Sequence, residues 1–176
     1  MKRIMLVDDE INVLQSLQRS LRKMGQEKQL VFELYTSAGE AIKRLGEAQF
    51  HMVIVDNHMP EMNGVAFLKR TKTMQPDAIR LMLSASAEFK TVLGAINDAE
   101  VFRYIEKPWD VVALEETIQL GLAKYDEIQA KEAMVDDARV QKHELTPQEL
   151  EEQRLEKEEP GITKVNRGPD GSIFLD

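Results

Sequence analysis

Short apolar segments alternate with amphipathic ones along the first two thirds of the chain. Five segments are compact, apolar and rich in β-branched residues, as strands are, and they span residues 3–7, 30–36, 51–55, 79–83 and 101–105. Between them, apolar residues recur three or four positions apart, which predicts helices. The helices are expected from residue 11 to a stop at Gly25, from a cap at Ser37 through Leu45, over residues 65–71 and over residues 87–97.

The regular alternation of strands and helices indicates the fold class. A helix between successive strands supplies the long crossover that parallel pairing needs. Apolar runs without strict polar alternation suit strands that are covered on both faces. We therefore expect an α/β fold, a doubly wound sheet of five parallel strands joined by right-handed crossovers.

A single long helix is predicted after Asp110. Its apolar positions follow a spacing of three and four, and they are Val111, Leu114, Ile118, Gly121, Tyr125 and Ile128. The helix could continue to about Glu144, which is longer than the fold needs. The excess half either projects into solvent or pairs its apolar stripe with a second copy. We expect pairing in a homodimer, so charged residues at Ile118 and Tyr125 should give a folded monomer.

The C-terminal residues predict a small appendage. Thr146-Pro147 is typical of a cap followed by a first-turn proline, and it would open an acidic helix over residues 148–158 that ends at Pro160-Gly161. Residues 162–165 and 172–175 are expected to form two short strands around a turn at 168–171. An isolated hairpin is marginal in water, so this one should pack on another part of the protein.

Composition excludes several classes of protein. The chain has no cysteine and three scattered histidines, which argues against thiol chemistry and zinc-type sites. No segment has the roughly 20 apolar residues of a membrane span, and the first apolar run meets Asp8 at once, so export is not expected. Residues 126–176 hold 14 acidic and 7 basic residues, most of the net charge of −8. An acidic tail argues against a nucleic-acid-binding module.

Polar residues collect where the predicted strands end. Asp8 and Asp9 follow the first strand, Asp56 the third, Ser84 the fourth and Lys107 the fifth. Ligands of open parallel sheets bind beyond these carboxyl ends, so the side chains should share one crevice. Three converging carboxylates favour a hard cation such as Mg²⁺, and the hydroxyl and the ammonium would face an anion. This set suits phosphoryl transfer to an aspartate.

The same residues resemble the receiver domains of two-component response regulators. The resemblance covers residues 1–125 and rests on Leu6-Val7-Asp8-Asp9-Glu10, Val53-Ile54-Val55-Asp56, Met59-Pro60 with Met62 and Gly64, Ser84-Ala85 and Lys107-Pro108-Trp109. It implies a flavodoxin-like sheet with strand order 2-1-3-4-5. The chain would then consist of a receiver at 1–125, a helix extension at 126–145 and an acidic appendage at 146–176.

The resemblance also implies a role for each site residue. Asp56 would accept the phosphoryl group, and Asp8, Asp9, Asp56 and the backbone carbonyl of His58 would hold Mg²⁺. Lys107 and Ser84 would contact the phosphoryl group. Ser84 and Tyr104 would act as switch residues.

Simpler interpretations of these residues remain open. Asp8 and Asp9 could cap the first helix, Ser84 could be an ordinary strand-end hydroxyl, and Tyr104 could be plain core.

The implied partner is a sensor histidine kinase, and the implied location is the cytoplasm. Beyond self-phosphorylation and slow self-dephosphorylation, no enzymatic activity is expected. The leading hypothesis for output is contact with an unknown downstream protein through the fourth helix, fifth strand, fifth helix and C-terminal extension. The alternative is the receiver and linker of a transcription factor or signalling enzyme whose output domain is not in this chain.

Overall fold

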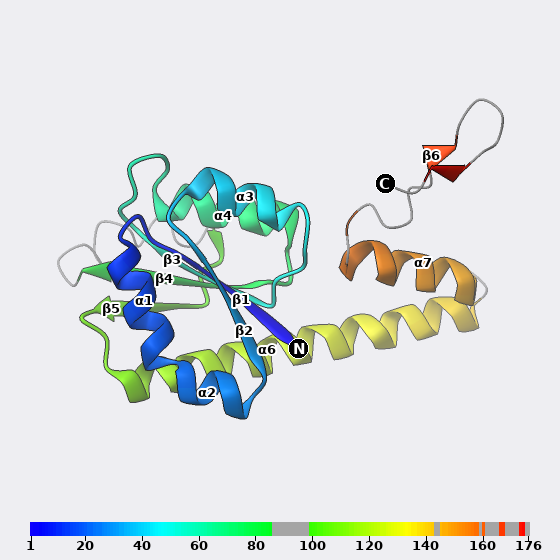
Figure 1. The fold of residues 1–176 in the computed structure, drawn as a ribbon. Coiled ribbons are helices and arrows are strands. Elements are labelled where there is room, and N and C mark those ends of the chain that lie inside the picture. The colour runs from blue at the N-terminus through cyan, green and yellow to red at the C-terminus, as the bar shows by residue number, and fades with distance from the viewer. Residues whose placement is uncertain (86–98, 143–144, 159, 161–165, 168–172, 175–176) are drawn as a thin grey trace.

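Five parallel strands form the central sheet, in the order β2-β1-β3-β4-β5 (Figure 1). The computed structural model describes residues 1–85, 99–142, 145–158, 160, 166–167 and 173–174. The strands are β1 (Lys2–Val7), β2 (Leu30–Tyr35), β3 (Met52–Asp56), β4 (Ile79–Ala85) and β5 (Arg103–Lys107). Every residue of β3 is buried, as expected for a strand between two layers of helices. The predicted fold class and strand order are confirmed.

Helices cover both faces of the sheet (Figure 1). Their bounds are α1 (Ile11–Ser20), α2 (Arg22–Glu27), α3 (Ala38–Leu45), α4 (Gly64–Met74), α6 (Val111–Gln141) and α7 (Pro147–Glu158). Leu14 of α1 and Ile118 of α6 pack with Ile4 and Leu6 on one face. The other face packs Met5 and Val7 against α3 and α4. The helix expected over 87–97 falls in a segment outside the described residues.

Gly25 does not end the first helix, which corrects the sequence prediction. The helix breaks earlier, at Leu21, and Gly25 lies inside α2, where its N–H donates to the Leu21 carbonyl at 2.8 Å. A Cβ at Gly25 would approach the Phe32 ring to 2.8 Å. The glycine therefore allows α2 to lie close to β2, and it does not end the helix.

The fifth strand begins two residues later than its apolar pattern suggests. Leu81 pairs with Arg103 and Ala85 with Lys107, so β5 runs from Arg103 to Lys107. Backbone pairing continues here although the side chains become polar. As a result Lys107 is the last residue of the strand.

The apolar stripe of α6 packs on the central sheet of the same chain. Leu114, Ile118, Gly121 and Tyr125 are buried there, and a Cβ at Gly121 would lie 2.5 Å from the end of Met52. The expectation that Ile118 and Tyr125 form a seam with a second copy is wrong for these residues. Periodicity showed that the helix has an apolar face, but it could not show what the face contacts.

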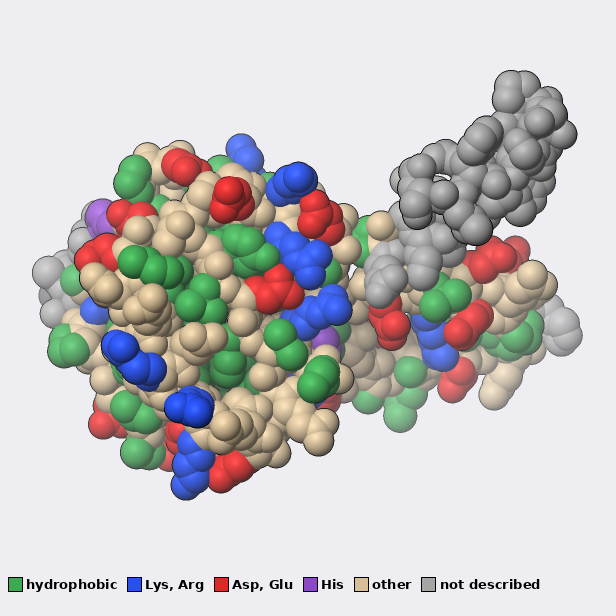
Figure 2. Space-filling model, in the orientation of Figure 1, with side chains coloured by type: hydrophobic (Ala, Val, Ile, Leu, Met, Phe, Trp, Pro, Cys, Tyr) green, Lys and Arg blue, Asp and Glu red, His purple; other side chains and the backbone are tan. Residues whose placement is uncertain are grey.

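Beyond the sheet, α6 continues as an arm, and α7 turns back alongside it (Figure 1). The helix ends at Gln141, close to the expected end, and α7 begins at Pro147 as the cap predicted. Figure 2 shows both acidic and basic side chains on the described part of this arm. Within the described residues, no helix is both long and apolar enough to cross a membrane.

A short antiparallel pair follows α7. It joins β6 (Asn166–Arg167) to β7 (Ile173–Phe174), so two strands of the expected kind are present. The segment 162–165 that was expected to form the first strand lies outside the described residues, as does the expected turn at 168–171.

Candidate functional site

Two buried carboxylates and one lysine meet at the carboxyl edge of the sheet. Asp8 follows β1, Asp56 ends β3 and Lys107 ends β5. The Lys107 ammonium lies 2.7 Å from Asp8 Oδ2 and 2.6 Å from Asp56 Oδ1. The Asp8 and Asp56 side chains are only 1% and 8% exposed. The predicted convergence of these three residues is therefore present in the structure.

Backbone N–H groups hold the two carboxylates in place. The N–H of His58 donates to Asp56 Oδ2 at 2.6 Å, and the N–H of Glu10 donates to Asp8 Oδ1 at 2.9 Å. Each aspartate thus has one oxygen bonded to the backbone and the other paired with Lys107. Two like charges can remain this close because a cation lies between them.

Burial and the lysine act in opposite directions on Asp8. Burial raises the pKa of Asp8 above its ordinary value, although hydrogen bonds from Lys107 and the Glu10 backbone oppose the shift. For Lys107, burial favours the neutral amine, but hydrogen bonds to Asp56 and Asp8 outweigh this and raise the pKa. Lys107 is therefore charged at neutral pH.

Gly64 lets the loop after β3 close against the site. A Cβ at this position would lie 2.4 Å from the carbonyl oxygen of Asp56. The Gly64 N–H donates to the Asn57 carbonyl at 3.0 Å, and Asn63 caps α4 by accepting from the Ala66 N–H. Sequence reasoning recognised Gly64 as part of a motif, but the structure supplies the physical reason for it.

Asp9 lies outside the buried pair. Its side chain is exposed, and within the described residues no three acidic or histidine side chains form a ready-made metal cluster. The donor set nevertheless fits a hard divalent cation, since it offers buried carboxylate oxygens of Asp8 and Asp56, the adjacent Asp9 and a main-chain carbonyl at His58. The same turn gives the N-cap position of α1 to Glu10, without a side-chain cap bond, rather than to Asp8 or Asp9.

Ser84 and Tyr104 lie on the neighbouring strands β4 and β5. Ser84 is buried, and its hydroxyl donates to the Ala85 carbonyl at 3.3 Å. Tyr104 pairs with Met82 in the sheet and is partly buried against the core between the sheet and α3 and α4. Burial raises its pKa above the ordinary value. Both residues therefore belong to strands whose carboxyl ends form the acidic edge.

Sequence reasoning missed two supports of the site. Asn57 is buried beside Asp56, and its N–H donates to the Leu83 carbonyl at 3.0 Å, which ties the loop to β4. Trp109 donates from its indole N–H to Ser20 Oγ at 3.3 Å, which ties the segment after Lys107 to α1. The polar Asn57 directly after an apolar strand was a signal for the first, whereas a contact across 89 residues left none.

Comparison with known proteins gives a consistent family. The response regulator receiver domain matches residues 4–119. The hydrogenase transcriptional regulatory protein HoxA of Bradyrhizobium diazoefficiens is 33% identical over 124 residues, which is 69% of this chain and 24% of HoxA. This chain thus spans about a quarter of the length of the curated relatives it matches.

Solved structures resemble the chain over the same region. The signal receiver domain of an HD domain-containing protein from Pseudomonas fluorescens Pf-5 has a TM-score of 0.65 and 28% identity, and covers 72% of this chain and 98% of its own. The response regulator TrrA of Thermotoga maritima, in complex with Mg²⁺ and BeF, has a TM-score of 0.60 and 26% identity, and covers 69% and 100%. By its sequence, fold and site, the chain belongs to the response regulator receiver domain family.

Proposed function

We propose that Asp56 accepts a phosphoryl group from a phosphorylated histidine of a sensor kinase. The observation that carries the proposal is the Lys107 ammonium, which bridges Asp56 and Asp8 at the carboxyl edge of the sheet. A carboxylate oxygen of Asp56 would attack phosphorus, a P–O bond would form, and the P–N bond would break with its electron pair returning to the imidazole. Lys107 would then neutralise charge on the transferred group.

The proposed metal is Mg²⁺, held by Asp8, Asp9, Asp56 and the backbone carbonyl of His58. When bound, it would neutralise the charge of the phosphoryl oxygens. The solved complex of TrrA with Mg²⁺ and BeF supports this choice. The residues of this chain contribute a buried pair of carboxylates, fixed by backbone donors at Glu10 and His58, that is already oriented before a ligand arrives.

Signalling, rather than turnover of an external substrate, is the proposed outcome. Ser84 and Tyr104 are proposed as switch residues, because they lie on β4 and β5, the two strands nearest the proposed output face. That face would include β5 and α6, together with the fourth helix that the sequence predicts over residues 87–97. We propose a cytoplasmic protein with no activity beyond self-phosphorylation and slow self-dephosphorylation.

The output is proposed to run through the segments that follow the receiver. A division into a receiver at 1–125, a helix extension at 126–145 and an appendage at 146–176 is supported by the buried positions of α6, which end at Tyr125. A homodimer and an unknown downstream protein are the proposed partners. The longer regulators that this chain matches favour a second candidate, in which these residues are the receiver and linker of a transcription factor or signalling enzyme.

Trp109 provides a direct test, because it is the one tryptophan of the chain and lies two residues after Lys107. Titration with Mg²⁺ and beryllofluoride should give a saturable change in its fluorescence. The beryllofluoride step should vanish in Asp56→Asn. It should persist in Asp126→Asn, a control that removes the same charge from an exposed pair with Lys2. An equal beryllofluoride response in Asp56→Asn would contradict the proposed site.

A further inference from the structure

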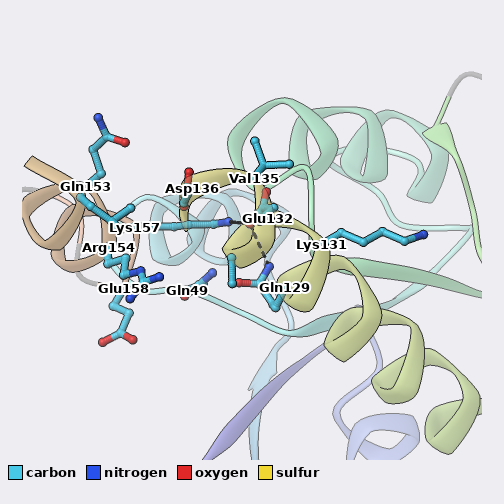
Figure 3. Close-up of a pocket in the computed structure, with 12 residues that line it drawn as sticks. Gln49, Gln129, Lys131, Glu132, Val135, Asp136, Gln153, Arg154, Lys157 and Glu158 are labelled. Carbon is cyan, nitrogen blue, oxygen red and sulfur yellow. Dashed lines mark hydrogen bonds and ion pairs between the residues drawn. The ribbon is translucent and has the colours of Figure 1, made fainter. Parts of the chain in front are cut away.

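The end of α7 is tied to both α6 and the receiver. The Lys157 ammonium lies 2.6 Å from Glu132 Oε2 of α6 and also pairs with Asp77, in the turn between α4 and β4. Gln129 donates to the same Asp77 carboxylate at 3.4 Å. Figure 3 shows Lys157 reaching from α7 toward Glu132, beside Gln129. One side chain therefore joins α7 to α6 and to the turn between α4 and β4.

One buried apolar side chain accompanies this ion cluster. Leu150 is only 8% exposed, although α7 is otherwise a mainly charged helix. It lines a groove together with Ala133 and Val135 of α6 and Gln49 of the receiver. By contrast Leu155, also in α7, is 40% exposed. Helix α7 thus has one side held against the protein and another side in solvent.

The helical state of α7 depends on this docking. Thr146 and Glu149 form a capping box, since the Thr146 N–H and hydroxyl donate to Glu149 Oε2 at 2.8 and 2.7 Å and the Glu149 N–H donates back at 3.2 Å. The cap sets where the helix begins. However, a helix of 12 residues is marginal in water by itself, so most of its stability must come from contacts with the rest of the chain.

These contacts are few and partly open to solvent. The Lys157 and Glu132 side chains are 39% and 44% exposed, whereas Asp77 is 14% exposed. Exposed ion pairs contribute little and are screened by salt. The ion pairs that hold α7 in its docked position are therefore weak enough for the helix to detach.

We propose that α7 is a releasable latch, which Lys157 and Leu150 close over the base of the receiver and the adjoining face of α6. In the closed state seen here, α7 lies beside α6, and the two helices line one groove that includes Gln129, Glu132 and Ala133 of α6. Release of α7 would open this face of α6. The latch lies at the end of the sheet opposite Asp56, and its ion pairs share no residue with the proposed phosphorylation site.

Hydrogen exchange of the full chain, followed by mass spectrometry, tests the latch. Amides of α7 should be protected in the wild type and should exchange several-fold faster in Lys157→Gln, while β1 and β3 remain unchanged. Lys124→Gln is the matched control, because Lys124 is a partly exposed lysine of α6 that pairs with Glu127 and does not line the groove. It should leave the protection of α7 as in the wild type.

A second variant separates docking from the intrinsic stability of the helix. Asp77→Asn changes no residue of α7, yet it should also speed exchange in α7. The double variant should exchange little faster than Lys157→Gln alone, because both substitutions remove the same Lys157–Asp77 pair. Rising salt should reduce protection in the wild type more than in Lys157→Gln. The latch is refuted if α7 of the wild type exchanges like an unfolded peptide, or if Lys157→Gln and Asp77→Asn both leave its protection unchanged.

Discussion

At the scale of single residues, Lys107 determines whether two buried carboxylates can lie side by side. Its ammonium contacts Asp8 and Asp56, and its side chain is 25% exposed. Without it, burial and mutual repulsion would both act against the ionised pair. The position of this lysine was predictable from the end of an apolar run. Its double contact was not, because strand order and register decide which side chains face each other.

Replacing Lys107 with Met should destabilise the protein in buffer that lacks divalent cations. Breaking a buried pair costs about 3–5 kcal/mol, and the partial exposure of Lys107 reduces the expected loss to roughly 1–3 kcal/mol. Urea unfolding at pH 7 measures it. Mg²⁺ should restore part of the loss. Lys124→Met, which removes an exposed lysine paired with Glu127, should change stability by less than about 0.5 kcal/mol, and an equal loss in both variants would count against the site.

His51 gives the protein a predictable response to acid. Burial, with smaller effects of Lys2 and the N-terminus, lowers the pKa of His51 to about 4 from its model-compound value of 6.5. Its Nδ1 accepts from the Arg3 N–H at 3.2 Å, which requires the neutral ring. A lowered pKa means that the unfolded chain binds the proton first. The stabilisation is therefore complete above pH 6.5 and is lost as the pH falls toward 4.

The variant His51→Gln should remove this part of the pH dependence. At pH 7.5 the variant should be less stable than the wild type. This difference in the free energy of unfolding should shrink by about 1–2 kcal/mol when the pH falls to 5, with allowance for partial exposure. Carboxylates titrate in both proteins, so the difference isolates the histidine. Urea unfolding at the two pH values measures it. A difference that does not change with pH would mean that His51 is protonated equally in both states.

At the scale of elements, α6 belongs to two parts of the molecule. Its first half completes the core, and its second half forms the arm on which α7 packs (Figure 1). The spacing of its apolar residues predicted the helix and nearly its end, because both follow from local pattern. The partner of each half depends on contacts between residues far apart in the chain, for which the pattern carries no signal.

The variants Ile118→Glu and Leu120→Glu should separate the two faces of α6. Ile118 is fully buried, so a carboxylate there should cost more than about 4 kcal/mol and unfold the receiver. Leu120 is 48% exposed, so the same change should cost less than about 1 kcal/mol. Thermal unfolding by circular dichroism distinguishes them. A folded Ile118→Glu monomer would instead support the seam between copies that the sequence suggested.

At the scale of the whole molecule, the receiver fold and its acidic edge were largely predictable. The places of Asp8 and Asp56 follow from apolar runs that stop at polar residues, whereas β4 and β5 continue two residues past their apolar runs, to Ala85 and Lys107. The docking of α7 was not predictable, because Lys157 and Asp77 are two ordinary charges among many and only the folded chain brings them together. The exposed position of Asp9 was likewise hidden, since a pair of adjacent acids does not show which one turns inward.

Phosphorylation of Asp56 is the claim that joins fold, site and signalling. Intact mass spectrometry after incubation with acetyl phosphate and Mg²⁺ tests it most directly. The wild type should gain the mass of one phosphoryl group, a chelator should prevent the gain, and Asp56→Asn should remain unlabelled. No label on the wild type, or an equal label on Asp56→Asn, would contradict the account.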